Sequence, residues 1–191
     1  MKNIFREDKA VIKRLLGYQF VSAVMGILLS GAAAQVRWLN LMTSVLTGFF
    51  YCYFIYNAVW EAAAKDRIKY DGNRMAKDMT RGLKFALAAN IPNFIIALCV
   101  FVGALVGVLT EAGWAVELTR YSIVVARFWE AMYTGFIVYV TPEAAQLTDL
   151  TTVLCSLLYL AIIVPAFAVS HFAYWMGFNN KHILKPSSKK N

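Results

Sequence analysis

The chain has 191 residues, of which 60% are hydrophobic and only 16% are charged. Soluble domains carry charges at about a quarter of their positions, so this composition excludes a soluble protein and predicts an all-α membrane protein. The formal net charge of +8 lies between apolar runs and not on a soluble face, so we expect membrane lipids and no nucleic acid as partners.

The first two apolar runs, residues 17–34 and 39–60, predict two spanning helices. A hydrocarbon core of about 30 Å needs roughly 20 apolar residues, and the short link at 35–38 makes the pair a tight antiparallel hairpin. The basic start and the alanines at 32–34 also imitate a signal peptide. Glu7 and Asp8 within the basic start favour an uncleaved span.

Two further runs, residues 85–109 and 150–174, predict the third and fourth spans. Each contains a proline, Pro92 in the third and Pro165 in the fourth. Proline removes a backbone hydrogen bond and can open a helix toward a cavity, although such kinks occur in spans of every function.

The segment between these spans, about residues 115–141, is apolar enough to be a fifth span but carries Arg127 and Glu130. A central charge in a span costs at least about 2.5 kcal/mol, so we expect an extracytoplasmic interfacial or re-entrant helix. The two residues are three apart, so we expect them to pair at the outer surface; alternatively they line an outer vestibule.

The distribution of basic residues supports four spans. Segments 1–16, 61–84 and 175–191 contain sixteen of the nineteen Lys and Arg residues. The positive-inside rule places all three in the cytoplasm, which requires an even number of spans. Five tryptophans then form belts at the two interfaces, with Trp38, Trp114 and Trp129 outside and Trp60 and Trp175 inside. A cysteine placed near Thr119 should therefore react from outside the cell.

The two hairpins have similar starts, Gly17-Tyr18-Gln19-Phe20 and Gly82-Leu83-Lys84-Phe85. A tandem duplication of an in–out–in unit would produce this pattern. The alternative is that every hairpin begins with a basic anchor and a small residue.

Small residues recur at helical spacing in two spans. Such faces let helices approach closely, either within this chain, which we favour, or in a homo-oligomer. The candidate helix-packing residues are Gly26, Ser30, Gly103 and Gly107.

Polar residues within the spans are few. The candidates for a polar cavity are Gln19, Asn57, Asn90, Asn93 and His171. They lie nearer the cytoplasmic ends of the spans than the middle, which disfavours a carrier that binds its substrate at mid-membrane. His171 is more typical of a hydrogen-bonded interfacial residue than of a proton relay.

Catalytic patterns are absent from the sequence: it has no HExxH, Walker, GxGxxG, CxxC or GxSxG motif. Cys155 and His171 are sixteen residues apart on one helix, about 24 Å, and cannot form a catalytic pair. We therefore predict no catalytic residue, cofactor or metal ligand, and an enzyme is the least supported class.

Three segments together carry a family resemblance: the stretch from Lys65-Asp66-Arg67 to Arg81-Gly82-Leu83-Lys84, then Asn90-Ile91-Pro92, and the ending Ala173-Tyr174-Trp175-Met176-Gly177-Phe178. In these the chain resembles uncharacterised small polytopic membrane proteins of Gram-positive (Firmicutes-type) bacteria. The resemblance implies the topology and a bacterial plasma membrane, and it implies no activity.

We predict a single integral membrane domain over residues 1–191 with cytoplasmic termini. The favoured function is a non-enzymatic multi-pass membrane subunit or accessory protein, with the alternating charges of 61–84 docking a protein partner or lipid headgroups. The alternative is a small-molecule carrier, or the substrate-capturing subunit of a transporter.

Overall fold

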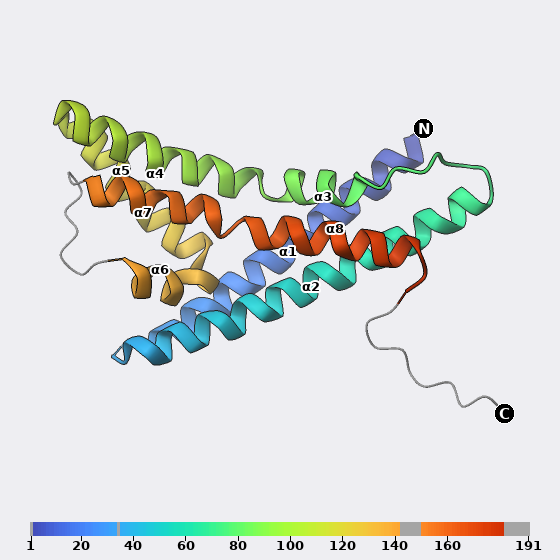
Figure 1. Cartoon of the computed structure of the whole chain (residues 1–191), viewed down its shortest axis with the longest axis horizontal. Helices are drawn as coiled ribbons and strands as arrows, with labels where there is room; N and C mark the ends of the chain where they lie inside the picture. The colour runs from blue at the N-terminus through green and yellow to red at the C-terminus, as the bar shows by residue number, and fades with distance from the viewer. Residues whose placement is uncertain (1, 34, 142–149, 182–191) are drawn as a thin grey trace.

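The computed structural model describes residues 2–33, 35–141 and 150–181, and within them every regular element is a helix. Four units are long and apolar enough to cross a membrane, which confirms the predicted number of spans. They are α1 (Lys2–Ala32, with Asp8–Ala32 as the candidate span), α2 (Arg37–Asp71), α4 (Ile91–Thr110) and the pair α7 (Leu150–Ala161) and α8 (Val164–Phe178). The helices lie side by side along the long axis of the molecule (Figure 1).

The first two helices continue past the predicted spans into the basic segments. α1 begins at Lys2 rather than at residue 17, and α2 runs to Asp71 rather than to residue 60. Charged residues do not end a helix, and only the apolar part needs to match the lipid. The predicted end of the first span, residue 34, lies outside the described residues.

The other two predicted spans, residues 85–109 and 150–174, are interrupted just before their prolines. α3 (Arg81–Ala89) is capped by Asn90, and α4 begins at Ile91 with Pro92 in its first turn. α7 and α8 are separated at residues 162–163, and Pro165 lies in the first turn of α8. Proline is tolerated there because the first N–H groups of a helix have no intrahelical acceptor. Both breaks lie near the middle of the molecule's long axis (Figure 1).

The segment between the third and fourth spans is a re-entrant hairpin. It consists of α5 (Gly113–Trp129), the 3₁₀ turn η1 (Ala131–Tyr133) and α6 (Thr134–Val140), with a bend of 87°. α5 starts, and α6 finishes, at the end of the molecule where α4 ends and α7 begins (Figure 1). Of the two forms that the sequence allowed, interfacial and re-entrant, the structure has the second.

Glycines hold this hairpin against the first two helices. A Cβ atom on Gly26 of α1 would lie 2.6 Å from the carbonyl oxygen of Ala131, and one on Gly135 of α6 would overlap the backbone of Asn40 on α2. The backbone amide of Gly135 donates a 2.7 Å hydrogen bond to Oγ of Ser44. Only glycine permits approaches this close, so the hairpin is packed deep among the spans.

The other small residues named from the sequence lie in contacts within the chain. A Cβ on Gly103 of α4 would be 2.6 Å from Oγ1 of Thr119 on α5, and one on Gly107 would meet Val116 at an ordinary 3.6 Å. Ser30 of α1 donates a 2.6 Å hydrogen bond to Asn40 of α2.

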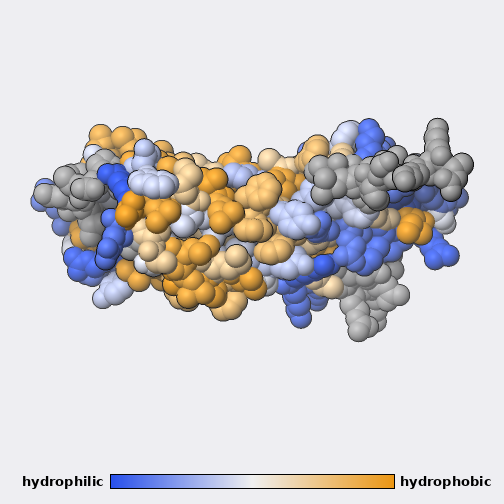
Figure 2. All heavy atoms as spheres, turned by 90° about the horizontal axis from the view of Figure 1, so that it is seen from below, coloured by the Kyte–Doolittle hydropathy of each residue, from blue (hydrophilic) through white to orange (hydrophobic). Residues whose placement is uncertain are grey.

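The outer surface is apolar around the middle and hydrophilic at both ends. Figure 2 shows this band on one face, with blue residues at the two extremities. Large apolar side chains from several helices are exposed, among them Leu28, Phe49, Leu98, Val124 and Leu154. In water this exposure would be costly, whereas in a bilayer these side chains contact lipid.

Candidate functional site

The end of the molecule that carries the basic segments contains a buried cluster of charges. Arg81 at the start of α3 lies between two carboxylates: Nη1 is 2.9 Å from Oδ2 of Asp66 on α2, and Nη2 pairs with Asp8 on α1. Tyr174 of α8 donates a 3.0 Å hydrogen bond to the same oxygen of Asp66. The side chains of Arg81 and Asp66 are 8% and 5% exposed, so this cluster joins four helices through groups almost removed from water.

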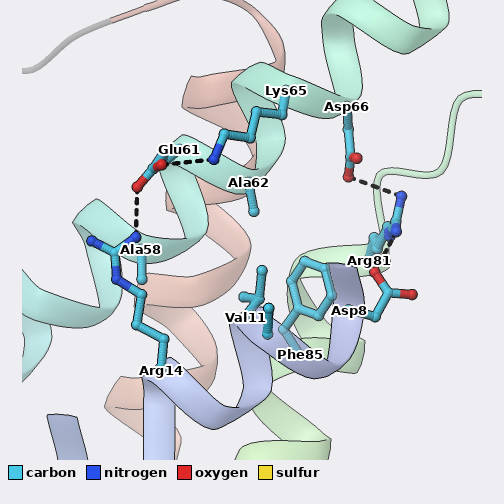
Figure 3. Close-up of a pocket in the computed structure, with 11 residues that line it drawn as sticks. Asp8, Val11, Arg14, Ala58, Glu61, Ala62, Lys65, Asp66, Arg81 and Phe85 are labelled. Atoms are coloured by element: carbon cyan, nitrogen blue, oxygen red, sulfur yellow. Dashed lines mark hydrogen bonds and ion pairs between the residues drawn. The ribbon is translucent and has the colours of Figure 1, made fainter. Parts of the chain in front are cut away.

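A cavity of about 370 Å³ opens beside this cluster, between α1 and α2 (Figure 3). Val11 and Phe85 give it an apolar floor. At its rim Glu61 accepts hydrogen bonds of 2.6 Å from Arg14 and 2.8 Å from Lys65. The volume is within the range of about 300 to 1,000 Å³ that small-molecule sites occupy. Because the rim charges are paired with one another, the cavity has no strong net charge to offer an ion.

A second cavity, of about 410 Å³, also reaches Arg81 and is bordered by Asp78 and Lys84. Asp78 accepts hydrogen bonds from the backbone N–H of Thr80 at 3.0 Å and from Nζ of Lys84 at 2.6 Å. The hydrogen bond from Lys84, followed by those from Thr80, lowers the pKa of Asp78 below its ordinary value. Asp78 is therefore ionised at neutral pH and fixes the start of α3.

Three of the polar residues proposed for a cavity meet in the interior of the bundle. Gln19 of α1 donates from Nε2 to Oδ1 of Asn93, and Nδ2 of Asn93 donates to Oδ1 of Asn90 at 2.9 Å. Nδ2 of Asn90 donates to the carbonyl oxygen of Ala86 at 2.8 Å. This relay of buried amides links α1 to the break between α3 and α4.

The re-entrant turn brings two more polar residues to this region. Nε1 of Trp129 donates a 2.7 Å hydrogen bond to the same Oδ1 of Asn93 that Gln19 reaches. Trp129 was expected at the outer interface, and that expectation is wrong because its indole is half-buried inside the bundle. Glu130, which follows it, is 1% exposed, and neither of its carboxyl oxygens has a hydrogen-bond partner in the described ranges of the chain.

Arg127 and Glu130 do not form the predicted pair. Glu130 is buried at the bend, whereas Arg127 is exposed and interacts with the phenol of Tyr159 on α7. The spacing of three residues would place them together on a continuous helix, but α5 ends at Trp129, between the two. The bend separates them.

The remaining two polar candidates lie elsewhere. Asn57 on α2 and His171 on α8 are both exposed. The structure does not bring either of them into the amide relay.

Several residues of both sites were not predicted as site residues from the sequence. Asp66, Arg81 and Tyr174 come from three helices, and the hydroxyl groups of Ser22 and Tyr133 are buried with no hydrogen-bond partner among the described residues. Their clustering depends on how helices pack, and no short motif records it. The one available signal was Asp66 itself, an acidic residue near the end of an apolar run.

In the described part of the chain, no group of three or more His, Cys, Asp and Glu side chains is arranged to hold a metal ion. Comparison with known proteins found no matching family model, no similar curated protein and no similar solved structure. The fold and these two sites are therefore the basis for assigning a function. What they establish is an all-α, multi-pass membrane protein.

Proposed function

We propose that this chain is a non-enzymatic subunit of a membrane assembly that binds its partner within the bilayer. We further propose that it resides in a bacterial plasma membrane with both termini in the cytoplasm, as its basic segments favour. The observation that supports a subunit most strongly is the position of Arg127.

Arg127 is exposed within the apolar surface of the molecule. Its neighbours on α5, Val124 and Phe128, are 62% and 58% exposed. α5 packs along α4 so that Thr119 meets Gly103 and Trp129 meets Asn93, which puts Arg127 level with the first half of α4. The end of α4 at Thr110 is then about 20 Å away at about 1.5 Å per residue. An arginine side chain cannot span that distance to the water beyond this end of α4.

A charged group in this position is expected to pair with an opposite charge. Glu130 does not serve because it is buried on the other side of the bend, and Tyr159 offers Arg127 only a neutral phenol. Arg127 has no carboxylate partner among the described residues, and this fits a carboxylate on a transmembrane helix of a partner. Interhelical polar contacts of this kind hold membrane subunits together.

Native mass spectrometry of the protein gently extracted from its membrane tests this function. We expect a stoichiometric complex in place of the 21.4 kDa chain, and its loss in Arg127→Leu. Arg120→Leu is the matched control, because Arg120 lies on the same helix and is paired at 3.0 Å with Glu117. A complex that survives in Arg127→Leu, or a wild-type protein that is monomeric, would contradict the proposal.

We propose that only some of the charged residues in the cytoplasmic segment 61–84 bind a partner. Asp66 and Arg81 are used inside the chain, so they are not available to a partner. Arg74 and Lys77 are exposed and could meet a protein surface or anionic lipid headgroups.

A small-molecule carrier, or a substrate-capturing subunit, is the second candidate. It is favoured by the central amide relay beside broken helices, which resembles the construction of transporter sites near the bilayer midplane. A bound small molecule in the same mass spectra would support it.

A further inference from the structure

Glu130 lies near the middle of the membrane-embedded part of the chain. The residue two places after it, Met132, has its carbonyl oxygen 2.9 Å from Oγ1 of Thr47 on α2. Thr47 is nine residues from Trp38 and thirteen from Trp60, or about 14 Å and about 20 Å along α2 at about 1.5 Å per residue. The carboxyl group is therefore far from water at either end.

The groups around Glu130 come from several helices, and none of them is cationic among the described residues. Tyr51 of α2, Tyr133 of η1 and Tyr159 of α7 interact electrostatically with the carboxyl group. Cys52 of α2 is also near Tyr51 and Tyr133, and its thiol is not a cation. Arg127 on α5 is exposed and interacts with the phenol of Tyr159, but it makes no hydrogen bond with the carboxyl oxygens of Glu130. Within the part of the chain that the structure describes, the carboxyl group thus has no paired positive charge.

Other buried oxygen atoms at this turn also lack partners. Gln19 and Ser22 of α1 face the turn. Gly26 lies one helical turn after Ser22 on the same helix and contacts the backbone of Ala131 in the turn. Among residues 2–33, 35–141 and 150–181, no group is hydrogen-bonded to Oε1 of Gln19, Oγ of Ser22 or the hydroxyl of Tyr133, and the same is true of both carboxyl oxygens of Glu130. Gln19 and Trp129 donate to the same oxygen of Asn93, which places the Gln19 amide beside the residue that precedes Glu130.

We infer that this turn is a binding site for one monovalent cation, a proton or a sodium ion, which neutralises Glu130 through the unpartnered oxygens of Glu130, Gln19, Ser22 and Tyr133. One carboxylate takes one positive charge. The neutral amide and hydroxyl oxygens complete the oxygen environment that a hard cation prefers. This site does not depend on whether Arg127 binds a partner.

The two cations differ in the chemistry they produce. A proton forms an O–H bond to a carboxylate oxygen, hydronium becomes water, and no electrons are transferred. Sodium leaves the carboxylate ionised and is held by ion–dipole contacts. In both cases release of the ion requires water to reach and solvate the carboxylate, because an uncompensated carboxylate in this position is strongly disfavoured.

Infrared spectroscopy of the full-length protein in lipid vesicles distinguishes them. Glutamate is labelled with ¹³C in its carboxyl group, and spectra are recorded at neutral pH in a sodium-free choline buffer and then with sodium chloride added. A carbonyl band of a protonated carboxylic acid that shifts with the label and persists in sodium identifies the proton. A band that is replaced by a carboxylate band when sodium is added identifies the sodium ion.

Variants assign the signal to Glu130. The labelled band should disappear in Glu130→Gln and remain in Glu117→Gln, which removes an exposed, paired glutamate from the same helix. Glu130→Asp retains a carboxyl group and should retain the band while losing its sensitivity to the glutamate label. Wild-type protein with neither a labelled acid band in choline nor any change on adding sodium would overturn the inference, and so would a labelled band that persists in both Glu130 variants.

Discussion

At the scale of single residues, the molecule contains two kinds of buried charge. Arg81 and Asp66 are removed from water together and satisfy each other, with Tyr174 and Asp8 completing the set. Glu130 is buried without any counter-charge in the described chain. The first arrangement is typical of a structural tie between helices, and the second is typical of a site that an ion occupies.

The buried pair can be tested by removing one partner and then both. Arg81→Met removes the nearer cation of Asp66 and leaves, among the described residues, only Lys69, whose Nζ is 3.8 Å from Oδ1, so we expect a loss of about 3 to 5 kcal/mol in the free energy of unfolding. The double variant Arg81→Met, Asp66→Asn should recover much of that loss, because residue 66 is then uncharged and Asp8, which also loses Arg81, is 28% exposed. Denaturation of the purified protein in mixed micelles measures both.

Lys65→Met provides the control for these variants, since Lys65 also pairs with a carboxylate but is 65% exposed. Exposed pairs contribute about 0 to 1 kcal/mol, so its effect should be small. If Arg81→Met were as stable as Lys65→Met, the buried charge cluster would not stabilise the packing of the helices.

At the scale of elements, the short helices of the re-entrant hairpin pack against the long spanning helices. α5, η1 and α6 enter the bundle because Gly26 and Gly135 leave room for backbone contact. The turn they form lies beside Asn90 and Asn93 at the break between α3 and α4, through the hydrogen bond from Trp129. Broken and re-entrant helices of this kind occur in membranes only where protein or a polar cavity covers the freed backbone groups.

The close packing of the hairpin against α1 predicts that alanine substitution at two glycines of α1 changes the free energy of unfolding differently. Gly26→Ala puts a methyl group into the backbone of the turn, and we expect a loss of about 1 to 3 kcal/mol by overpacking. Gly17→Ala should be neutral or stabilising by up to about 1 kcal/mol, because nothing lies within 4 Å and alanine favours a helix. Thermal unfolding in detergent compares the two variant proteins. Equal melting temperatures would argue against close packing of the hairpin on α1 at Gly26.

At the scale of the whole molecule, polarity runs along the long axis. An apolar band separates two hydrophilic ends (Figure 2), and the paired charges around Arg81 mark the end that the basic residues share. Three lysines of the C-terminal basic segment, Lys185, Lys189 and Lys190, lie outside the described residues. The orientation of this axis in the membrane is the remaining topological prediction.

Cysteine labelling in intact cells tests the orientation, in a background in which Cys52, Cys99 and Cys155 are replaced by alanine. Gly113→Cys, at the exposed start of α5, should react with a membrane-impermeant thiol reagent, and Arg74→Cys should react only after lysis. The opposite pattern would reverse the proposed topology. Position 119 is unsuitable as a probe because Thr119 is fully buried against Gly103.

The sequence alone determined the class of the protein and the number of spans, because a long apolar run is a local property that requires a helix in lipid. It also located the polar residues Gln19, Asn90 and Asn93, since few polar side chains interrupt those runs. It could not establish which of them meet.

Only the tertiary structure decided the sites. The wrong prediction that Arg127 pairs with Glu130 assumed a continuous helix, whereas α5 bends after Trp129, and the structure leaves Arg127 exposed and Glu130 buried. The tie between Asp66 and Arg81 and the burial of Glu130 both depend on close contacts between segments far apart in the chain. Such contacts follow from the shapes of packed helices, and no local pattern of residues records them.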